Sequence, residues 1–164
     1  MQMKAKLIAL SLLCISMGTI EVQAQKENKQ IKEKMNAAQT KKTEINKQLV
    51  TKAYQRIFGE LDAAAVDEFM SKDFLQHNPT IADGQNGVKA LVQMLITRGV
   101  PKQKIEFRHI IAEGDIVILH SRYGMAGKEW RFIDIYRVEN NKIVEHWDAM
   151  MQMPEKRANN NPIF

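Results

Sequence analysis

The sequence predicts an α+β fold in which three helices pack on one face of an antiparallel sheet of about four strands. Apolar residues first recur with helical spacing. The pattern then changes to short runs of Ile, Val, Phe, Tyr and Trp between turn residues. The chain has 164 residues, of which 45% are hydrophobic and 26% are charged. This is the composition of one soluble globular domain, so a collagen-like, disordered or coiled-coil chain is excluded.

The N-terminus has the pattern of a secretory signal peptide. Lys4 and Lys6 precede an apolar run over residues 7–17, and Val22-Gln23-Ala24 supplies small or modest residues at the cleavage-site spacing. The apolar run is too short to cross a bilayer, which takes roughly 20 residues. We therefore expect residues 1–24 to be removed near Ala24 and the mature chain to be exported, to the periplasm or the medium, without a stable membrane anchor.

The single cysteine bears on the same question. A lipoprotein would use Cys14 as its lipid acceptor, but the bulky Leu13 precedes it and both lie inside the apolar run, which disfavours this alternative. Cleavage after Ala24 would leave a mature chain without cysteine, as suits an oxidising compartment. No Cys/His spacing resembles a zinc site, so we expect no metal.

Residues 25–43 form a polar, lysine-rich stretch in which Ile31 and Met35 are the only large apolar residues. We interpret it as a linker or a frayed helix that is too polar to build a core. Much of the formal net charge of +5 lies here. No aromatic residue interleaves the lysines, so a solvated spacer is favoured over a nucleic-acid-binding segment.

Three helices are expected in the domain that follows, over residues 44–164. The first covers 44–58, with Thr43 as its N-cap and Gly59 at its end. A short second helix covers 63–70, and a third runs from 87 to 98 before a Gly and a Pro stop it. An irregular stretch with an Asn-Pro turn signal separates the last two helices.

The second half of the domain reads as a meander of strands. Gly114-Asp115 and Asn140-Asn141 are two-residue hairpin signals between runs of β-branched and aromatic residues. The expected strands are 104–112, 116–124, 128–139 and 142–152.

The last hairpin sets the pairing of its strands. If Asn140-Asn141 is a two-residue turn, Ile135 faces His146 and Ile133 faces Asp148. His146 and Asp148 share a face in any register, because residues i and i+2 of a strand point the same way.

Two further connections complete the sheet. A two-residue turn at Gly114-Asp115 places His109 opposite His120. A four-residue loop over 124–127 then places His120 beside Arg131. One face of the sheet would carry His109, His120, Arg131, His146 and Asp148 among Ile111, Ile118, Ile133 and Ile135.

Such a face is typical of a binding cavity, in which apolar walls hold a ligand and a few polar groups orient it. A carboxylate among isoleucines favours its protonated form, which suits Asp148 for general acid–base chemistry. Both faces are too apolar to be bare, so we expect the helices to cover one and a second copy of the chain, in a homodimer, to cover the other. The opposite face would carry Leu119, Trp130, Phe132, Asp134, Tyr136 and Trp147.

Plainer interpretations of these polar groups stay open. The His146-x-Asp148 pair could be a surface salt bridge, and His77 before Asn-Pro could cap a loop. Asp134 is interpreted as a structural partner of Arg137.

Several sequence blocks, in this order, together resemble the SnoaL-like branch of the nuclear transport factor 2-like superfamily. The resemblance covers about residues 45–164. The blocks are Phe74-Leu75-Gln76-His77-Asn78-Pro79, Asp83-Gly84, Glu113-Gly114-Asp115-Ile116-Val117, His120-Ser121, Asp134-Ile135-Tyr136-Arg137-Val138 and Lys142-Ile143-Val144-Glu145-His146-Trp147-Asp148.

The resemblance implies a cone-shaped fold whose curved sheet wraps helices around a deep pocket, commonly dimeric through the sheet. Polyketide cyclases of this kind close a ring by aldol condensation with neither metal nor cofactor. By its position in the His-Trp-Asp block, Asp148 would remove a proton next to a carbonyl and return it. His146, His120 and His77 would orient the substrate or donate to the oxyanion. The further ligand-binding residues expected are Arg131, Ile118, Ile133 and Ile135.

Two function classes follow. The first is a cofactor-free lyase or isomerase that acts on a small hydrophobic carbonyl compound. The second is an exported, non-catalytic small-molecule binding protein with the same pocket. Neither class involves nucleic acid.

The signal-peptide pattern yields a direct test. The intact mass of the exported protein should correspond to a chain that begins at Gln25, because cleavage follows the Val22-Gln23-Ala24 segment. Full-length protein recovered from the cytoplasm, with no processed form elsewhere, would contradict the expectation.

Overall fold

The computed structural model describes residues 2–164, with side chains for residue 23 and residues 25–164. The chain divides into two compact units, Met1–Lys41 and Lys42–Phe164. Except for Gln23, the side chains of the predicted signal peptide lie outside the described residues. Within the part of the chain that the structure describes, no helix is both long enough and apolar enough to cross a bilayer.

Helix α1 covers Gln2–Tyr54 and therefore begins before the predicted start at residue 44. Thr43 lies inside this helix, so its predicted role as an N-cap is wrong. The reason is composition, because Lys, Gln, Glu and Ala propagate a helix well even without an apolar face. The lysine-rich stretch is accordingly helical and largely exposed, including Ile31 and Met35.

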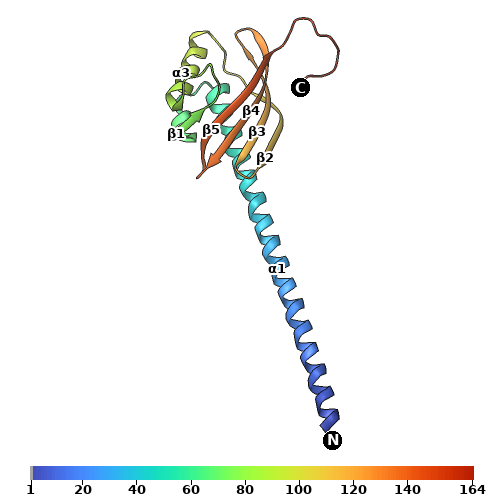
Figure 1. Ribbon diagram of the computed structural model, residues 1–164. Helices are drawn as coiled ribbons and strands as arrows, with labels where there is room; N and C mark the ends of the chain where they lie inside the picture. Colours follow the sequence, from blue (N-terminus) through green and yellow to red (C-terminus); the bar gives the residue numbers. More distant parts are fainter. Residues whose placement is uncertain (1) are drawn as a thin grey trace. The chain divides into compact units, whose positions relative to one another are not determined.

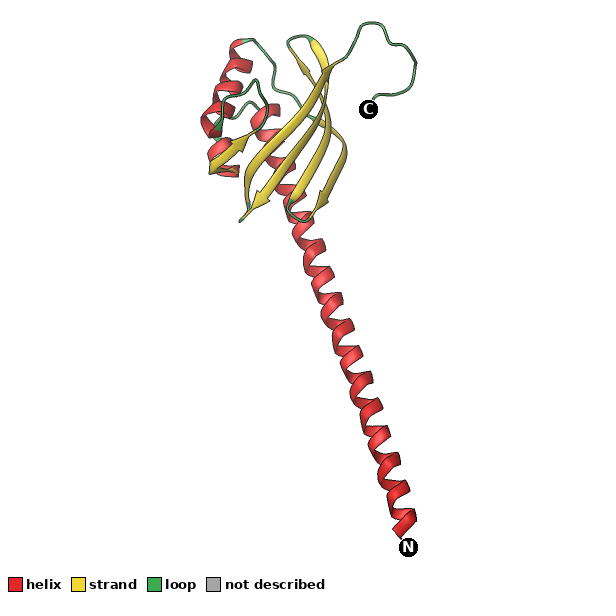
Figure 2. Cartoon of the chain, in the orientation of Figure 1, coloured by secondary structure: helices red, strands yellow, loops and turns green. Residues whose placement is uncertain are grey.

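The domain after residue 42 has the predicted α+β architecture. Figure 1 shows the strands β2–β5 side by side and the shorter β1 next to α3, and Figure 2 shows the helices of this unit beside the curved sheet. The sheet order is β1-β5-β4-β3-β2. After α1, the elements are the π-helix η1 (Gln55–Gly59), α2 (Ala65–Phe69), β1 (Met70–Gln76), α3 (Gly84–Thr97), β2 (Glu106–Glu113), β3 (Ile116–Met125), β4 (Lys128–Glu139) and β5 (Lys142–Gln152).

The four predicted strands are present within two residues of their expected bounds, but the sheet has a fifth. Strand β1 pairs in parallel with β5 through an irregular register, in which Gln76 lies opposite His146. Sequence patterning missed it because polar Ser71, Lys72 and Asp73 interrupt the apolar residues. This extra strand brings the Gln-His-Asn-Pro block next to the His-Trp-Asp block.

Two of the three hairpins follow, or nearly follow, the predicted pairing. His109 lies opposite His120, as the Gly114-Asp115 turn predicts. The next connection is a tight turn at Ala126-Gly127 rather than a four-residue loop, so His120 faces Ile133 instead of Arg131. Both turn residues have positive φ, as a two-residue hairpin turn requires. The shift is by two residues, so every side chain keeps its predicted face.

The last hairpin departs from prediction in a way that matters for function. The Asn140-Asn141 turn forms, but the register shifts by one residue directly after the first pairs. Val138 faces Ile143, whereas its neighbour Arg137 faces Glu145. Val144 is the extra residue of this β-bulge. Beyond it, Tyr136 faces His146, Asp134 faces Asp148 and Ile135 faces Trp147. The predicted pairs Ile135–His146 and Ile133–Asp148 are therefore wrong, because one inserted residue moves all later side chains to the other face.

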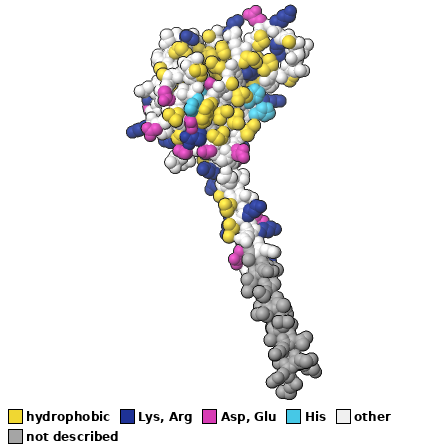
Figure 3. All heavy atoms as spheres, viewed as in Figure 1, with side chains coloured by type: hydrophobic (Ala, Val, Ile, Leu, Met, Phe, Trp, Pro, Cys, Tyr) yellow, Lys and Arg dark blue, Asp and Glu magenta, His cyan; other side chains and the backbone are white. Residues whose placement is uncertain are grey.

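The two faces of the sheet differ accordingly. The inner face packs on the helices and builds the core with Val117, Leu119, Phe132, Tyr136, Val138 and Ile143. The outer face keeps apolar side chains in contact with solvent, among them Ile111 (56% exposed) and Ile133 (41% exposed). Figure 3 shows hydrophobic side chains gathered on the visible face of this unit. A homodimer through the outer face stays a prediction.

Helix α3 holds the loop that precedes it. The Asp83 carboxylate accepts hydrogen bonds from the backbone N–H groups of Gln76 (2.7 Å) and Gly84 (2.9 Å), which joins the end of β1 to the start of the helix. Gly87 lies close under this loop: a Cβ there would come within 1.7 Å of the Ala82 carbonyl oxygen. The turn between β1 and α3 thus depends on glycine at position 87, because any side chain there would collide with the loop.

Gly87→Ala should destabilise the fold, although alanine normally favours a helix over glycine by about 1 kcal/mol. The clash with the Ala82 carbonyl outweighs propensity, and the loss should be about 1–3 kcal/mol, as for overpacked cores. Urea unfolding measures it. Gln93→Ala, at an exposed position of the same helix, is the matched control and should stay within roughly 0.5 kcal/mol. A Gly87→Ala variant as stable as wild type would refute the close approach.

Candidate active site

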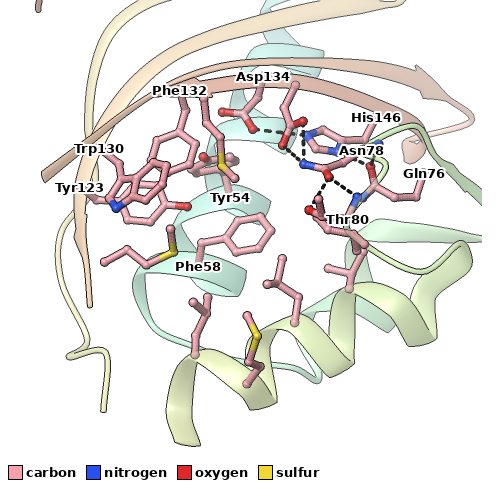
Figure 4. Close-up of a pocket in the computed structure, with 18 of the residues that line it drawn as sticks. Tyr54, Phe58, Gln76, Asn78, Thr80, Tyr123, Trp130, Phe132, Asp134 and His146 are labelled. Carbon is pink, nitrogen blue, oxygen red and sulfur yellow. Dashed lines mark hydrogen bonds and ion pairs between the residues drawn. The ribbon is translucent and has the colours of Figure 1, made fainter. Parts of the chain in front are cut away.

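A cavity of about 370 Å³ lies between the helices and the inner face of the sheet. Its wall is mostly apolar and rich in aromatic rings, which include Tyr54, Phe58, Tyr123, Trp130 and Phe132. Polar side chains gather on one side, where Figure 4 shows Gln76, Asn78, Thr80, Asp134 and His146 close together. Asp148 completes this polar group. An apolar cavity with a few convergent polar groups is the usual form of a small-molecule site.

Asp148 is held by a residue from the loop after β1. Asn78 Nδ2 donates to both carboxylate oxygens of Asp148, at 2.8 Å each. The orientation of this amide is fixed, because Asn78 Oδ1 accepts from the backbone N–H of Thr80 (2.8 Å) and from the Thr80 hydroxyl (2.7 Å). An atom that accepts an N–H bond must be the oxygen, so the NH₂ group faces Asp148.

The protonation of His146 follows from a similar argument. Gln76 Oε1 accepts the backbone N–H of Asn78 (2.9 Å), which identifies it as the amide oxygen. His146 Nδ1 lies 2.9 Å from the same oxygen and must therefore carry a hydrogen. Its other nitrogen, Nε2, faces Asp134 Oδ1 at 3.2 Å. His146 is 5% exposed, so these contacts are shielded from water.

Asp134 and His146 share one proton. Since Nδ1 already donates, the contact between Nε2 and Oδ1 holds a hydrogen either as an aspartic acid or as an imidazolium. Burial raises the pKa of Asp134, an effect that His146 and the Tyr54 hydroxyl reduce. Asp134 is 3% exposed, and its Oδ2 has no hydrogen-bond partner among the described residues. The Asp134–His146 pair, which shares this proton, thus lies next to the Asp148 carboxylate.

The same three residues could also hold a metal ion. Asp134, His146 and Asp148 each offer one ligand atom, and these atoms lie within 4.8 Å of one another. Imidazole with carboxylates is a common ligand set for divalent transition metals. A bound ion would have to displace the proton that Asp134 and His146 share, and would have Gln76 as the partner that orients the imidazole.

The structure separates the residues that the sequence placed on one face. Asp148 and His146 line the cavity. His77 does not: its ring stacks on Trp147 with centroids 4.6 Å apart, and Nε2 bonds Glu145 at 2.9 Å. The bulge at Val144 turns His146 and Asp148 to the inner face, whereas the other expected site residues stay on the outer face. These are His120, Arg131, Ile118, Ile133 and Ile135.

Sequence patterning missed Asp134 and the roles of Gln76 and Asn78. Asp134 was interpreted as a partner of Arg137, but Arg137 pairs with Glu145 (2.7 Å) and Glu139 (2.9 Å). Gln76 ends β1, which pairs with β5 and so brings Gln76 opposite His146, and Asn78 lies in the loop that follows. Sequence patterning could place neither residue, because it does not predict β1 as a strand.

The domain has the nuclear transport factor 2-like fold, with N-terminal helices packed on a five-stranded, mostly antiparallel sheet. The SnoaL-like domain family matches residues 50–146, and the chain belongs to this family. No curated protein matches the chain.

Solved structures share the fold at low sequence identity. A candidate polyketide cyclase from Acidithiobacillus ferrooxidans is 16% identical over 65% of this chain and 87% of its own, with a TM-score of 0.54. An NTF2-like protein of unknown function from Cytophaga hutchinsonii is 17% identical over 65% and 89%, also with a TM-score of 0.54. The candidate polyketide cyclase IdmH from Streptomyces antibioticus is 19% identical over 64% and 91%, with a TM-score of 0.52. These likenesses show the fold.

The burial of Asp134 predicts an unusual pH dependence of stability. Its raised pKa means that the folded chain keeps this proton above the ordinary value of 3.8, where the unfolded chain loses it. The free energy of unfolding therefore falls as the pH rises. Relative to Asp134→Asn, wild type should lose stability from about pH 4 towards neutrality. Urea unfolding across this range tests the slope.

Asp83 supplies a control of opposite sign. Hydrogen bonds from the backbone N–H groups of Gln76 and Gly84 lower the pKa of Asp83, so its stabilising effect is lost as the pH falls. Wild type should gain stability relative to Asp83→Asn as the pH rises. Parallel slopes for both comparisons would contradict the account of Asp134.

Proposed function

We propose that the protein is an enzyme that removes a proton next to a carbonyl group of a small hydrophobic substrate and delivers it elsewhere, as a lyase or isomerase of the aldol or cyclase type. The observation that carries the proposal is the position of Asp148 between an aromatic cavity and a proton-holding pair. Membership in the SnoaL-like family supports the choice of reaction class, since relatives of the same fold include candidate polyketide cyclases.

Asp148 is the proposed general base. Its carboxylate is oriented by Asn78 and lines the cavity, so a bound ketone could place its α-carbon within reach. The base takes the α-proton, and the electron pair of the C–H bond moves into the enolate. The loop residue Thr80 contributes indirectly, because it fixes the amide that positions the carboxylate.

The Asp134–His146 pair is the proposed acid. The pair lies beside Asp148 and holds one proton. It can donate this proton in a hydrogen bond to the developing enolate oxygen. In an isomerase, Asp148 then returns its proton to another carbon. In a cyclase, the enolate carbon attacks a second carbonyl carbon of the same molecule, and the new alkoxide takes up the proton. Protons balance in both cases without another reactant.

We further propose that this chemistry takes place outside the cytoplasm, because the N-terminal residues have the pattern of an export signal. The substrate would then be a compound present in the periplasm or the medium.

Exchange of α-protons for deuterium in α-tetralone, followed by NMR in heavy water, tests the proposal. Wild type should accelerate the exchange, and Asp148→Asn should slow it by at least about 100-fold, the usual contribution of a general base. Calorimetry should show that the variant keeps its affinity for the ketone within a few-fold. Glu145→Gln, on the other face of the same strand, should exchange at the wild-type rate.

The alternative, a non-catalytic binding protein, gives a different result. Wild type and Asp148→Asn would then bind the ketone equally, and neither would exchange its protons faster than buffer does. That outcome would refute catalysis by Asp148.

A further inference from the structure

Two buried polar atoms in the cavity wall have no partner. Among the side chains that the structure describes, three buried nitrogen or oxygen atoms lack a hydrogen bond: Trp130 Nε1, Arg131 Nε and Asp134 Oδ2. Trp130 and Asp134 line the same cavity, whereas Arg131 does not. A buried polar group without a partner is costly, and in a binding site a ligand can supply the missing bond.

Asp134 belongs to the acid–base group, but Trp130 lies apart from it. Figure 4 shows Trp130 and Tyr123 on one side of the cavity and Asn78 and His146 on the other. Trp130 and Asp134 are four residues apart on β4 and share its inner face, which separates their Cα atoms by roughly 13 Å at 3.3 Å per residue. The cavity thus has a second polar group, the Trp130 N–H, at a distance from the acid–base residues.

No described side chain around Trp130 accepts a hydrogen bond from its Nε1. Its cross-strand neighbours are Tyr123, whose hydroxyl interacts with Tyr54, and the exposed Gln152. The Phe132 ring lies 6.4 Å away, and the other nearby lining side chains include Met125 and Met150. An indole N–H can only donate, so its natural partner is an oxygen that accepts.

We propose that the Trp130 N–H is a specificity-determining subsite that binds an acceptor oxygen of the substrate at the end remote from Asp148. The ligand class is a flat, fused-ring aromatic ketone with an ether, hydroxyl or second carbonyl oxygen far from the reacting carbonyl. The assignment of the reacting end rests on the proposed function. Flat rings suit the wall, where Tyr123 and Phe132 stack at 4.3 Å with an interplanar angle of 4°.

The selectivity has a simple origin. A site built to hydrogen-bond a ligand rejects an analogue that lacks the matching group, because the protein's own polar atom then stays buried and unpaired. An ethyl group has the size of a methoxy group but accepts no hydrogen bond. Two ketones that differ only in this substituent therefore isolate the contribution of Trp130.

Calorimetric titration with 6-methoxy-1-tetralone and 6-ethyl-1-tetralone provides the test. Wild type should bind the methoxy ketone about tenfold more tightly than the ethyl ketone, as one buried hydrogen bond would give. Trp130→Phe keeps a ring but loses the N–H, so its preference should fall to nearly one. Trp147→Phe, on the outer face, is the matched control and should keep the preference.

The outcomes separate this inference from the proposed function. Equal binding of both ketones by wild type, a preference that survives in Trp130→Phe, or binding of neither ketone would overturn the Trp130 subsite. A Trp130-dependent preference without deuterium exchange would sustain the subsite and refute the enzyme. Thermal melting of Trp130→Phe establishes that the variant is folded before its affinities are compared.

Discussion

One extra residue in strand β5 decides which face of the sheet carries the candidate site. The bulge at Val144 turns His146 and Asp148 towards the helices, next to Asp134. Without it, both would lie on the outer face among exposed isoleucines, and the cavity would lose the proposed base and half of the proposed acid pair. The contact between Asp134 and His146 and the position of Asp148 beside them both depend on this single register shift.

A second constraint comes from the loop between β1 and α3. Asp83 ties the loop to both elements, and Gly87 lets the helix approach it closely. The loop then presents Asn78 to Asp148, while Gln76 at the end of β1 bonds His146. Each amide has its orientation set by a backbone N–H group. Strands β4 and β5 therefore supply the two carboxylates and the imidazole, the loop orients Asp148 through Asn78, and the end of β1 orients His146 through Gln76.

Much of the fold follows from local signals. The hairpin residues Gly114-Asp115 and Asn140-Asn141 set two turns correctly, and the change from helical to strand patterning separates the two layers. The bulge has no such signal, because Val144 resembles any other β-branched strand residue. Asp148 and His146 were predicted as a pair because residues i and i+2 share a face in any register. Their neighbours were mispredicted, because register across strands is a tertiary property.

Detecting the contact between Asn78 and Asp148 is the most direct test that Asp148 lies on the inner face of the sheet. Proton NMR should show a nuclear Overhauser effect between the side-chain amide of Asn78 and the β-protons of Asp148, because Asn78 Nδ2 lies 2.8 Å from both carboxylate oxygens. It should also show none between Asp148 and the methyl groups of Ile133. Contacts from Asp148 to Ile133 and Ile135, with none to Asn78, would place the carboxylate on the outer face and contradict the account.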